Sequence, residues 1–153
     1  MTAFELQEDL KKEIENLLRE IKLKNTSGKF TQIKGYEQSL PIQREDEPEL
    51  FPYFIVRIDS GSIDSDISWQ DVKIILLFGI YDEAEDTNGH KDILNLIEKV
   101  QQRFQKIPHL NKKFKVDAKM EWTLQDEDTF PYYFGGMEMV FNTAVVGKED
   151  LFS

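Results

Sequence analysis

The segment from Asp71 to Tyr81 constrains the fold more than any other part of this 153-residue chain. Ile75 and Leu77 lie on one face of a strand over this segment, and five further apolar residues alternate along the other face: Val72, Ile74, Leu76, Phe78 and Ile80. A strand that is apolar on both faces lies in the middle of a sheet or is covered on both sides. We therefore expect the strand over 70–81 to be the structural centre of the fold.

Two other segments have the apolar spacing of amphipathic helices. The first, over 3–24, begins with the Thr2-to-Glu5 spacing of a capping box, in which each residue satisfies a backbone N–H group of the other. The second, over 89–107, follows a candidate N-cap at Thr87 or Asn88 and ends at Pro108. The apolar stripes consist of Leu6, Leu10, Ile14, Leu17, Leu18 and Ile21 in the first helix and Ile93, Ile97, Val100, Phe104 and Ile107 in the second.

Three more strands are expected, over about 51–58, 114–124 and 134–146. Pro52 belongs at the start of its strand, because proline cannot donate to a ladder. Gly135-Gly136 indicates a close backbone approach or a bulge. The inward-facing residues are Phe114, Val116, Ala118, Met120, Trp122 and Leu124 in the second of these strands, and Met137, Met139, Phe141, Thr143 and Val145 in the third.

The order of these elements predicts the fold class. Residues 30–42 have no clean period and are read as a short strand or an irregular connection. The whole chain, 1–153, is then one α+β domain, with a mostly antiparallel sheet of four to five strands packed against two amphipathic helices. Its length and its 40% hydrophobic residues suffice for one core.

Composition excludes several classes of protein. The chain has no cysteine, which removes disulfides, thiolate zinc sites and cysteine nucleophiles. Its first residues lack the apolar run of a signal peptide. The longest apolar stretch, Ile74 to Tyr81, is too short to cross a membrane. We expect a soluble protein with no membrane partner.

The charge is acidic overall and unevenly spread. Nineteen Lys and Arg oppose 29 Asp and Glu, for a net charge of -10, which disfavours tight binding to nucleic acid. Residues 44–86 are strongly acidic, whereas residues 99–119 contain seven basic residues and one acid, Asp117. Such asymmetry suits a subunit that sets one face against the opposite face of a neighbour. The alternative is solvated surface, with bases placed near a helix C-terminus.

Candidate catalytic and metal-binding residues are few. His90 and His109 are the two histidines, and neither accompanies a recognisable nucleophile motif. The acidic segment 82–89 is similar to a calcium loop, but that alignment puts Ala84 at the first ligand position and Asn95 at the twelfth, where a glutamate is required. We therefore expect no enzyme, with no catalytic, cofactor-binding or metal-binding residue.

Several segments, in their order along the chain, resemble one family. They are Phe51-Pro52-Tyr53-Phe54-Ile55-Val56-Arg57, Gly79-Ile80-Tyr81-Asp82, Asn88-Gly89-His90-Lys91-Asp92, Glu121-Trp122 and Phe130-Pro131-Tyr132-Tyr133-Phe134-Gly135-Gly136-Met137. Together they look like the small tail proteins of siphophages and prophages of Gram-positive bacteria, of the tail-terminator or tail-completion (minor tail protein) type. The resemblance covers about residues 50–146.

The resemblance implies a structural role in the virion tail, reached through assembly in the cytoplasm of the bacterial host. Such proteins are α+β subunits that close into a ring, typically hexameric, which caps the tail tube and presents a surface to the head connector. The implied partners are further copies of the chain, the major tail protein and a head-completion or connector protein. No cofactor is implied, and DNA passes through the ring without sequence-specific contact.

Two groups of residues are candidates for contacts between copies, since aromatic residues are enriched in interface cores and unlike charges favour association. Core packing is the alternative for the aromatic group. Two other functions stay open: an acidic protein-binding regulator or inhibitor that competes with DNA for a basic partner, and a metal-dependent carboxylate enzyme. The candidate interface residues are Phe51, Tyr53, Tyr132, Tyr133 and Phe134, together with Lys112, Lys113, Lys115 and Lys119.

Overall fold

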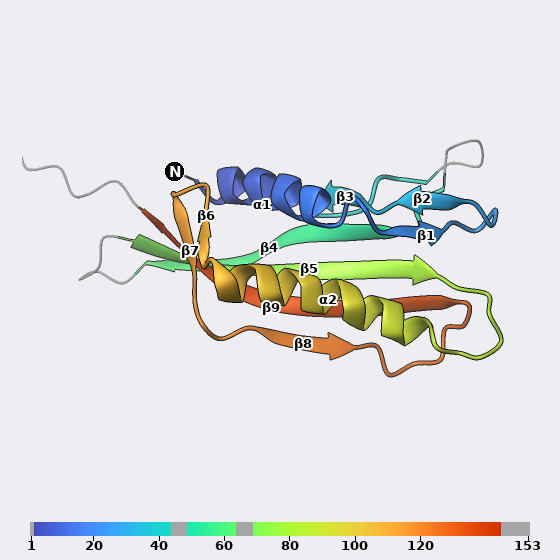
Figure 1. The fold of residues 1–153 in the computed structure, drawn as a ribbon. Coiled ribbons are helices and arrows are strands. Elements are labelled where there is room, and N and C mark those ends of the chain that lie inside the picture. Colours follow the sequence, from blue (N-terminus) through green and yellow to red (C-terminus); the bar gives the residue numbers. More distant parts are fainter. Residues whose placement is uncertain (1, 44–48, 64–68, 145–153) are drawn as a thin grey trace, which may run out of the picture.

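A computed structural model describes residues 2–43, 49–63 and 69–144, and these residues form two helices and nine strands (Figure 1). The α+β class and the two helices agree with the prediction. In chain order the elements are α1 (Ala3–Leu17), β1 (Lys22–Lys24), β2 (Phe30–Gln32), β3 (Lys34–Glu37), β4 (Tyr53–Ile63), β5 (Trp69–Tyr81), α2 (Gly89–Lys106), β6 (His109–Leu110), β7 (Phe114–Val116), β8 (Glu121–Leu124) and β9 (Tyr132–Ala144).

Seven of the described strands form one mixed sheet in the order β3-β4-β5-β9-β7-β6, and β8 pairs with β9 beside β7. β3 and β4 are parallel, while every other pair in this sheet is antiparallel. β1 and β2 form a separate hairpin. The sheet therefore has more strands than the four to five expected, and the additional strands are two to four residues long.

β5 lies at the centre of the sheet, as its two apolar faces predict. β4 pairs along one edge of it, with Phe54 opposite Phe78. β9 pairs along its other edge without interruption, from Trp69 opposite Ala144 to Tyr81 opposite Tyr132. The backbone hydrogen-bonding groups on both edges of β5 thus pair with long strands, β4 and β9.

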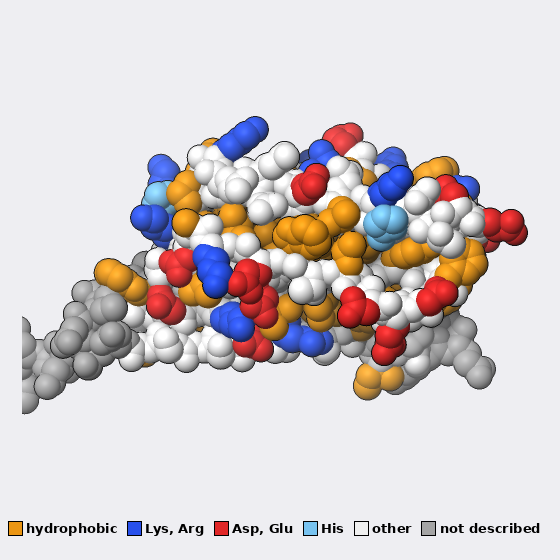
Figure 2. Space-filling model, turned by 90° about the horizontal axis from the view of Figure 1, so that it is seen from below, with side chains coloured by type: hydrophobic (Ala, Val, Ile, Leu, Met, Phe, Trp, Pro, Cys, Tyr) orange, Lys and Arg blue, Asp and Glu red, His pale blue; other side chains and the backbone are white. Residues whose placement is uncertain are grey.

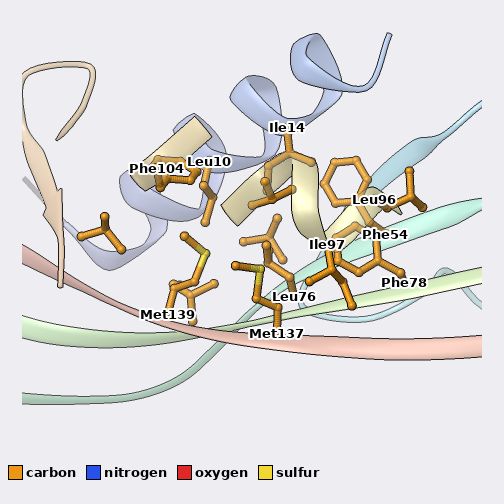
Figure 3. Close-up of a cluster of buried hydrophobic side chains, with 14 of the residues drawn as sticks. Leu10, Ile14, Phe54, Leu76, Phe78, Leu96, Ile97, Phe104, Met137 and Met139 are labelled. Carbon is orange, nitrogen blue, oxygen red and sulfur yellow. The ribbon is translucent and has the colours of Figure 1, made fainter. Parts of the chain in front are cut away.

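The core lies between the two helices and one face of the sheet (Figure 3). α1 packs against β3 and β4, and α2 packs against β5 and β9. Every second residue of each central strand points into this layer, because side chains alternate across a strand. The buried side chains labelled in Figure 3 are Leu10, Ile14, Phe54, Leu76, Phe78, Leu96, Ile97, Phe104, Met137 and Met139.

The first helix is shorter than the predicted 3–24. It ends at Leu17, and residues 22–24 instead pair with residues 30–32 as β1. Leu18 is buried and Ile21 packs against the core, so the helical spacing of these two residues reflects packing of the turn that follows the helix. At the other end, the Thr2 hydroxyl accepts a hydrogen bond from the backbone N–H of Glu5 at 3.2 Å, which is one of the two bonds of the predicted capping box; the Glu5 carboxylate lies 3.8 Å from Lys113.

The strand predicted over 114–124 is two strands, and this prediction was wrong. Val116 pairs with Phe141 in β7, and Glu121 pairs with Glu138 in β8. Between these two pairs there are four residues on one side, 117–120, and only two on the β9 side, 139 and 140. The four residues therefore cannot all pair with β9, and the strand is interrupted. Ala118, expected to face inward, is exposed, and Trp122 is 45% exposed.

The glycine pair in β9 permits close approach, and the alternative of a bulge is wrong because the β5–β9 register is continuous. A Cβ atom on Gly135 would overlap the Cγ2 methyl of Ile93 in α2, so the missing side chain lets the helix sit directly on the strand. Met137, Met139, Phe141 and Thr143 are buried as predicted. Val145 lies outside the described residues.

Candidate assembly surfaces

The sheet face turned away from the helices bears a cluster of aromatic side chains. The Phe51 ring lies 5.0 Å from the rings of Tyr53 and Tyr132 and 6.1 Å from that of Phe134, between centroids. The Tyr81 ring lies 5.6 Å from that of Tyr132. These five residues, Phe51, Tyr53, Tyr81, Tyr132 and Phe134, are called the aromatic cluster below. The sheet thus brings together four of the five aromatic residues predicted from sequence for contacts between copies.

Tyr133, the fifth predicted aromatic residue, lies on the opposite face of the sheet. It alternates with Tyr132 and Phe134 along β9, and its ring covers Gly89 at the start of α2, where a Cβ atom would overlap it. Its hydroxyl oxygen is buried without a hydrogen-bond partner among the described residues. Tyr133 therefore fixes the position of α2 against the sheet and does not join the aromatic cluster.

Exposure divides the cluster into an inner and an outer part. Tyr53 is 6% exposed, and burial raises the pKa of its phenol. Tyr132 is 37% exposed, and Phe130, two residues before it, is 43% exposed. Packing within the aromatic cluster thus accounts for Tyr53, whereas Phe130 and Tyr132 present aromatic surface to solvent.

Two acidic loops lie at the same end of the sheet as the aromatic cluster (Figure 1). In Figure 2, Asp and Glu side chains lie at the right-hand end, and others lie among Lys and Arg side chains in the left half of the same face. One loop follows β5 and the other connects β8 to β9. In the loop that follows β5, the acidic side chains lie close enough to affect Asp92. Its pKa is raised by burial and by the negative charges of Asp82 and Asp86. We call this surface the acidic end; its acids are Asp82, Glu83, Glu85, Asp86, Asp126, Glu127 and Asp128.

Three of the four predicted lysines, Lys112, Lys113 and Lys115, lie at the opposite end of the strands, where β6 turns into β7 (Figure 1). Lys113 is 3.8 Å from a Glu5 carboxylate oxygen. The fourth, Lys119, lies just before β8, level with the middle of β5; its ammonium is 2.9 Å from a Glu121 carboxylate oxygen and lowers the pKa of that carboxyl group. We call the surface at the β6–β7 turn and the end of α2 the basic end; its lysines are Lys106, Lys112, Lys113 and Lys115.

The basic end also contains a cleft of about 510 Å³ between the C-terminal turn of α2 and the segment from β7 to residue 120. It opens where residues 117–120 leave the ladder. Sequence reasoning missed it because Ala118 and Met120 were read as inward-facing members of one continuous strand. The cleft is lined by Phe104, Gln105, Pro108, Lys115, Val116, Asp117, Ala118, Met120 and Asn142.

The two histidines lie on different elements, near opposite ends of α2. His90 is half-buried at the start of α2, and His109 is exposed in β6. In residues 2–43, 49–63 and 69–144, no three acidic or histidine side chains converge in a way that could hold a metal ion. Within the same ranges, neither helix combines the length and the apolar character that a membrane crossing requires.

The sequence matches no protein-family model, and no curated protein has a sequence significantly similar to it. A function is therefore inferred below from the two ends of the molecule and from the segments of sequence quoted above.

Proposed function

We propose that this chain is a structural subunit of a phage tail, of the tail-terminator or head–tail completion type. Copies of it join into a ring that caps the tail tube and meets the head connector. The observation that supports this most directly is the placement of an acidic end and a basic end at opposite ends of the same strands. The segments that resemble tail proteins supply the link to phage assembly.

Opposite charge at opposite ends favours one kind of contact between copies. A two-fold symmetric contact through either end would set acid against acid or lysine against lysine, and such like-charge juxtaposition costs several kcal/mol. A head-to-tail contact sets lysine against acid. Repetition of a head-to-tail contact gives a ring when its rotation closes.

Both ends have charged side chains without an ion-pair partner among the described residues, and these can take part in the contact. Lys106, Lys112 and Lys115 make no ion pair with another described residue, and neither do Asp126 and Glu127. These side chains are exposed. Pairing them with a neighbouring copy therefore breaks no ion pair within the subunit.

Net acidity agrees with a ring through which DNA passes. The chain carries a net charge of -10. Repeated around a ring, this charge repels phosphate and keeps a passage from retaining DNA. The major tail protein and the head connector are then the partners on the two sides of the ring.

Electron microscopy of tail tubes tests the proposal. Tubes assembled from the major tail protein of the same phage or prophage are mixed with the chain carrying a gold-labelled tag. We expect label at one end of each tube and arrested tube growth. The variant Lys112→Glu/Lys115→Glu should label fewer ends, because it lowers the positive charge of the basic end. Label absent from tube ends, with growth unchanged, would contradict the proposed function.

A second function is favoured by one feature of the acidic end. Exposed Phe130 and Tyr132 beside seven acids would also suit a basic protein, and such a complex would make the chain a regulator that competes with DNA. Stoichiometry separates the two functions. A regulator forms a one-to-one, salt-sensitive complex with a DNA-binding protein, whereas a ring subunit forms multiples of itself.

A further inference from the structure

The turn over 125–131 at the acidic end exposes an aromatic side chain that follows three acids in the chain. Phe130 is 43% exposed, and Asp126, Glu127 and Asp128 precede it closely in the chain. A large exposed apolar side chain within a charged surface is typical of an interaction site. The turn therefore offers an aromatic ring and negative charge in one small area.

Hydrogen bonds hold this turn in a single shape. The Phe130 N–H donates to an Asp128 carboxylate oxygen at 3.2 Å, and the Thr129 hydroxyl donates to the Tyr132 carbonyl at 2.6 Å. The Asp82 N–H donates to the Pro131 carbonyl at 2.9 Å, which ties the turn to the end of β5. Such preorganisation lowers the entropy lost when a surface binds.

The cleft at the basic end has matching properties. Its lining is largely apolar, from Phe104, Pro108, Val116 and Met120, and Lys115 stands among the lining residues. Its volume of about 510 Å³ lies within the range of pockets that hold drug-sized ligands and exceeds what a phenyl ring needs. An apolar lining with a lysine beside it thus matches the aromatic ring and the carboxylates of the turn.

Asp117 is the acid that lines the cleft, and it is already engaged. Its carboxylate accepts a hydrogen bond from the Asn142 side-chain amide at 3.3 Å. Lys115, the other charged lining residue, has no ion-pair partner among the described residues, and neither has Lys106, which follows Gln105 of the lining in the chain. Lys115 is therefore free to meet a carboxylate at the cleft.

We propose that the 125–131 turn of one copy inserts Phe130 into the cleft of a second copy, with Asp126 and Glu127 meeting Lys106 and Lys115. We call the 125–131 turn with Phe130 the knob. The occupant of the cleft is a second copy, because the knob and the cleft belong to the same chain and lie at opposite ends of its strands. Each copy then gives one knob and receives one, as a repeating head-to-tail contact requires. This inference rests on the proposed self-assembly and names the surfaces that carry it.

Crosslinking through introduced cysteines tests the contact, since the chain contains no cysteine of its own. Glu127→Cys labels the knob and Ala118→Cys labels the cleft; both positions are exposed, and neither side chain makes a described ion pair or hydrogen bond. A short bifunctional maleimide should join the two variants when they are mixed in concentrated solution. Either variant alone should give almost no dimer. Glu8→Cys, exposed on α1, replaces Ala118→Cys as a control and should give no product.

Removal of the knob supplies the second measurement. Phe130→Ala in the Glu127→Cys chain should lower the yield of crosslinked dimer about tenfold or more, as expected when an interface loses an aromatic anchor. Phe4→Ala in the same chain removes an exposed aromatic ring from α1 and should leave the yield unchanged. Circular dichroism confirms that both variants are folded.

Three results would overturn the inference: equal yield with Phe130→Ala, equal yield with the Glu8→Cys control, or a dimer of Glu127→Cys with itself. These results are separable from failure of the proposed function. Label at tube ends without the specific crosslink removes this contact and leaves the function standing. The specific crosslink without label at tube ends leaves the contact as a property of the chain and removes the function.

Discussion

Gly135 and Gly136 are adjacent in β9 and face opposite sides of the sheet, so a side chain added at each would meet different neighbours. At Gly135 the Ile93 side chain of α2 occupies the space of a Cβ atom. At Gly136 the nearest atom to a Cβ would be the Leu77 Cδ2 methyl at 3.3 Å, at the end of a flexible side chain. Only the first glycine sets the distance between a helix and the sheet.

Gly135→Ala should therefore lower the free energy of unfolding by about 1–3 kcal/mol, the usual range for overpacking a core. The added methyl forces α2 away from β9, because the opposing atom belongs to a buried helix residue. Urea denaturation followed by circular dichroism measures the change. Gly136→Ala is the matched control and should lie within about 1 kcal/mol of the wild type, since loss of a glycine also reduces the entropy of the unfolded chain. Equal destabilisation by the two substitutions would contradict this account.

At the scale of elements, β3 is too short to pair with the whole of β4, and the side chain of Gln38 continues its ladder. The Gln38 amide donates to the Ile58 carbonyl and accepts from the Ile58 N–H, both at 3.0 Å. Gln7 of α1 also donates to the Gln38 side chain at 3.0 Å and to the Val56 carbonyl at 2.8 Å. One side-chain amide thus takes the place of a strand residue and connects the sheet edge to α1.

Gln38→Ala should speed hydrogen exchange at the Ile58 amide by about fivefold to tenfold, which corresponds to loss of a hydrogen bond worth about 1 kcal/mol. Exchange at the central residues of β5 should change less, because those amides are protected by strands on both sides. Mass spectrometry or NMR measures the rates. Gln102→Ala, exposed on α2, is the control and should leave Ile58 unaffected. Unchanged exchange at Ile58 in Gln38→Ala would show that other contacts protect this edge.

Elements with many residues could be predicted from sequence, and those with few could not. The alternation in β5 and the apolar stripe of α2 each extend over more than ten residues, so their periods are unambiguous. β1, β2 and β6 contain two or three residues and therefore have no period. The alternation over 114–124 was real, but whether a strand stays paired depends on the register of its partner, which local sequence does not contain.

At the scale of the whole molecule, the sequence indicated unlike charges but not their positions. The acidic loops at 82–86 and 126–128 are some 40 residues apart in the chain, and antiparallel pairing of β5 with β9 brings them to one end. The same topology sends the aromatic cluster to that end and the lysines to the other. A composition bias thus becomes a charge separation along the molecule only once the strand order is known.

This charge separation predicts how reversed variants associate. Asp126→Lys/Glu127→Lys reverses the charge at two positions of the acidic end, and Lys112→Glu/Lys115→Glu reverses it at two positions of the basic end. Each variant alone should associate at least about tenfold more weakly than the wild type, because every head-to-tail contact then sets like charges together at the reversed positions, and each 1.4 kcal/mol of repulsion is a factor of ten. Sedimentation velocity at low ionic strength measures this.

Mixing the two reversed variants decides between a head-to-tail contact and a general effect of charge. In an alternating assembly, every contact sets lysine against acid at the reversed positions, so association should return toward that of the wild type. It should weaken again as salt is added, because exposed charges are screened over about 10 Å at 0.1 M ionic strength. As a control, Lys12→Glu/Lys99→Glu reverses two exposed charges on the helices. Mixing this variant with either end-reversed variant should not restore association. If the mixture of end-reversed variants associates no better than its components, the acidic end of one copy does not meet the basic end of the next. Charge at the two ends then gives no support for a ring.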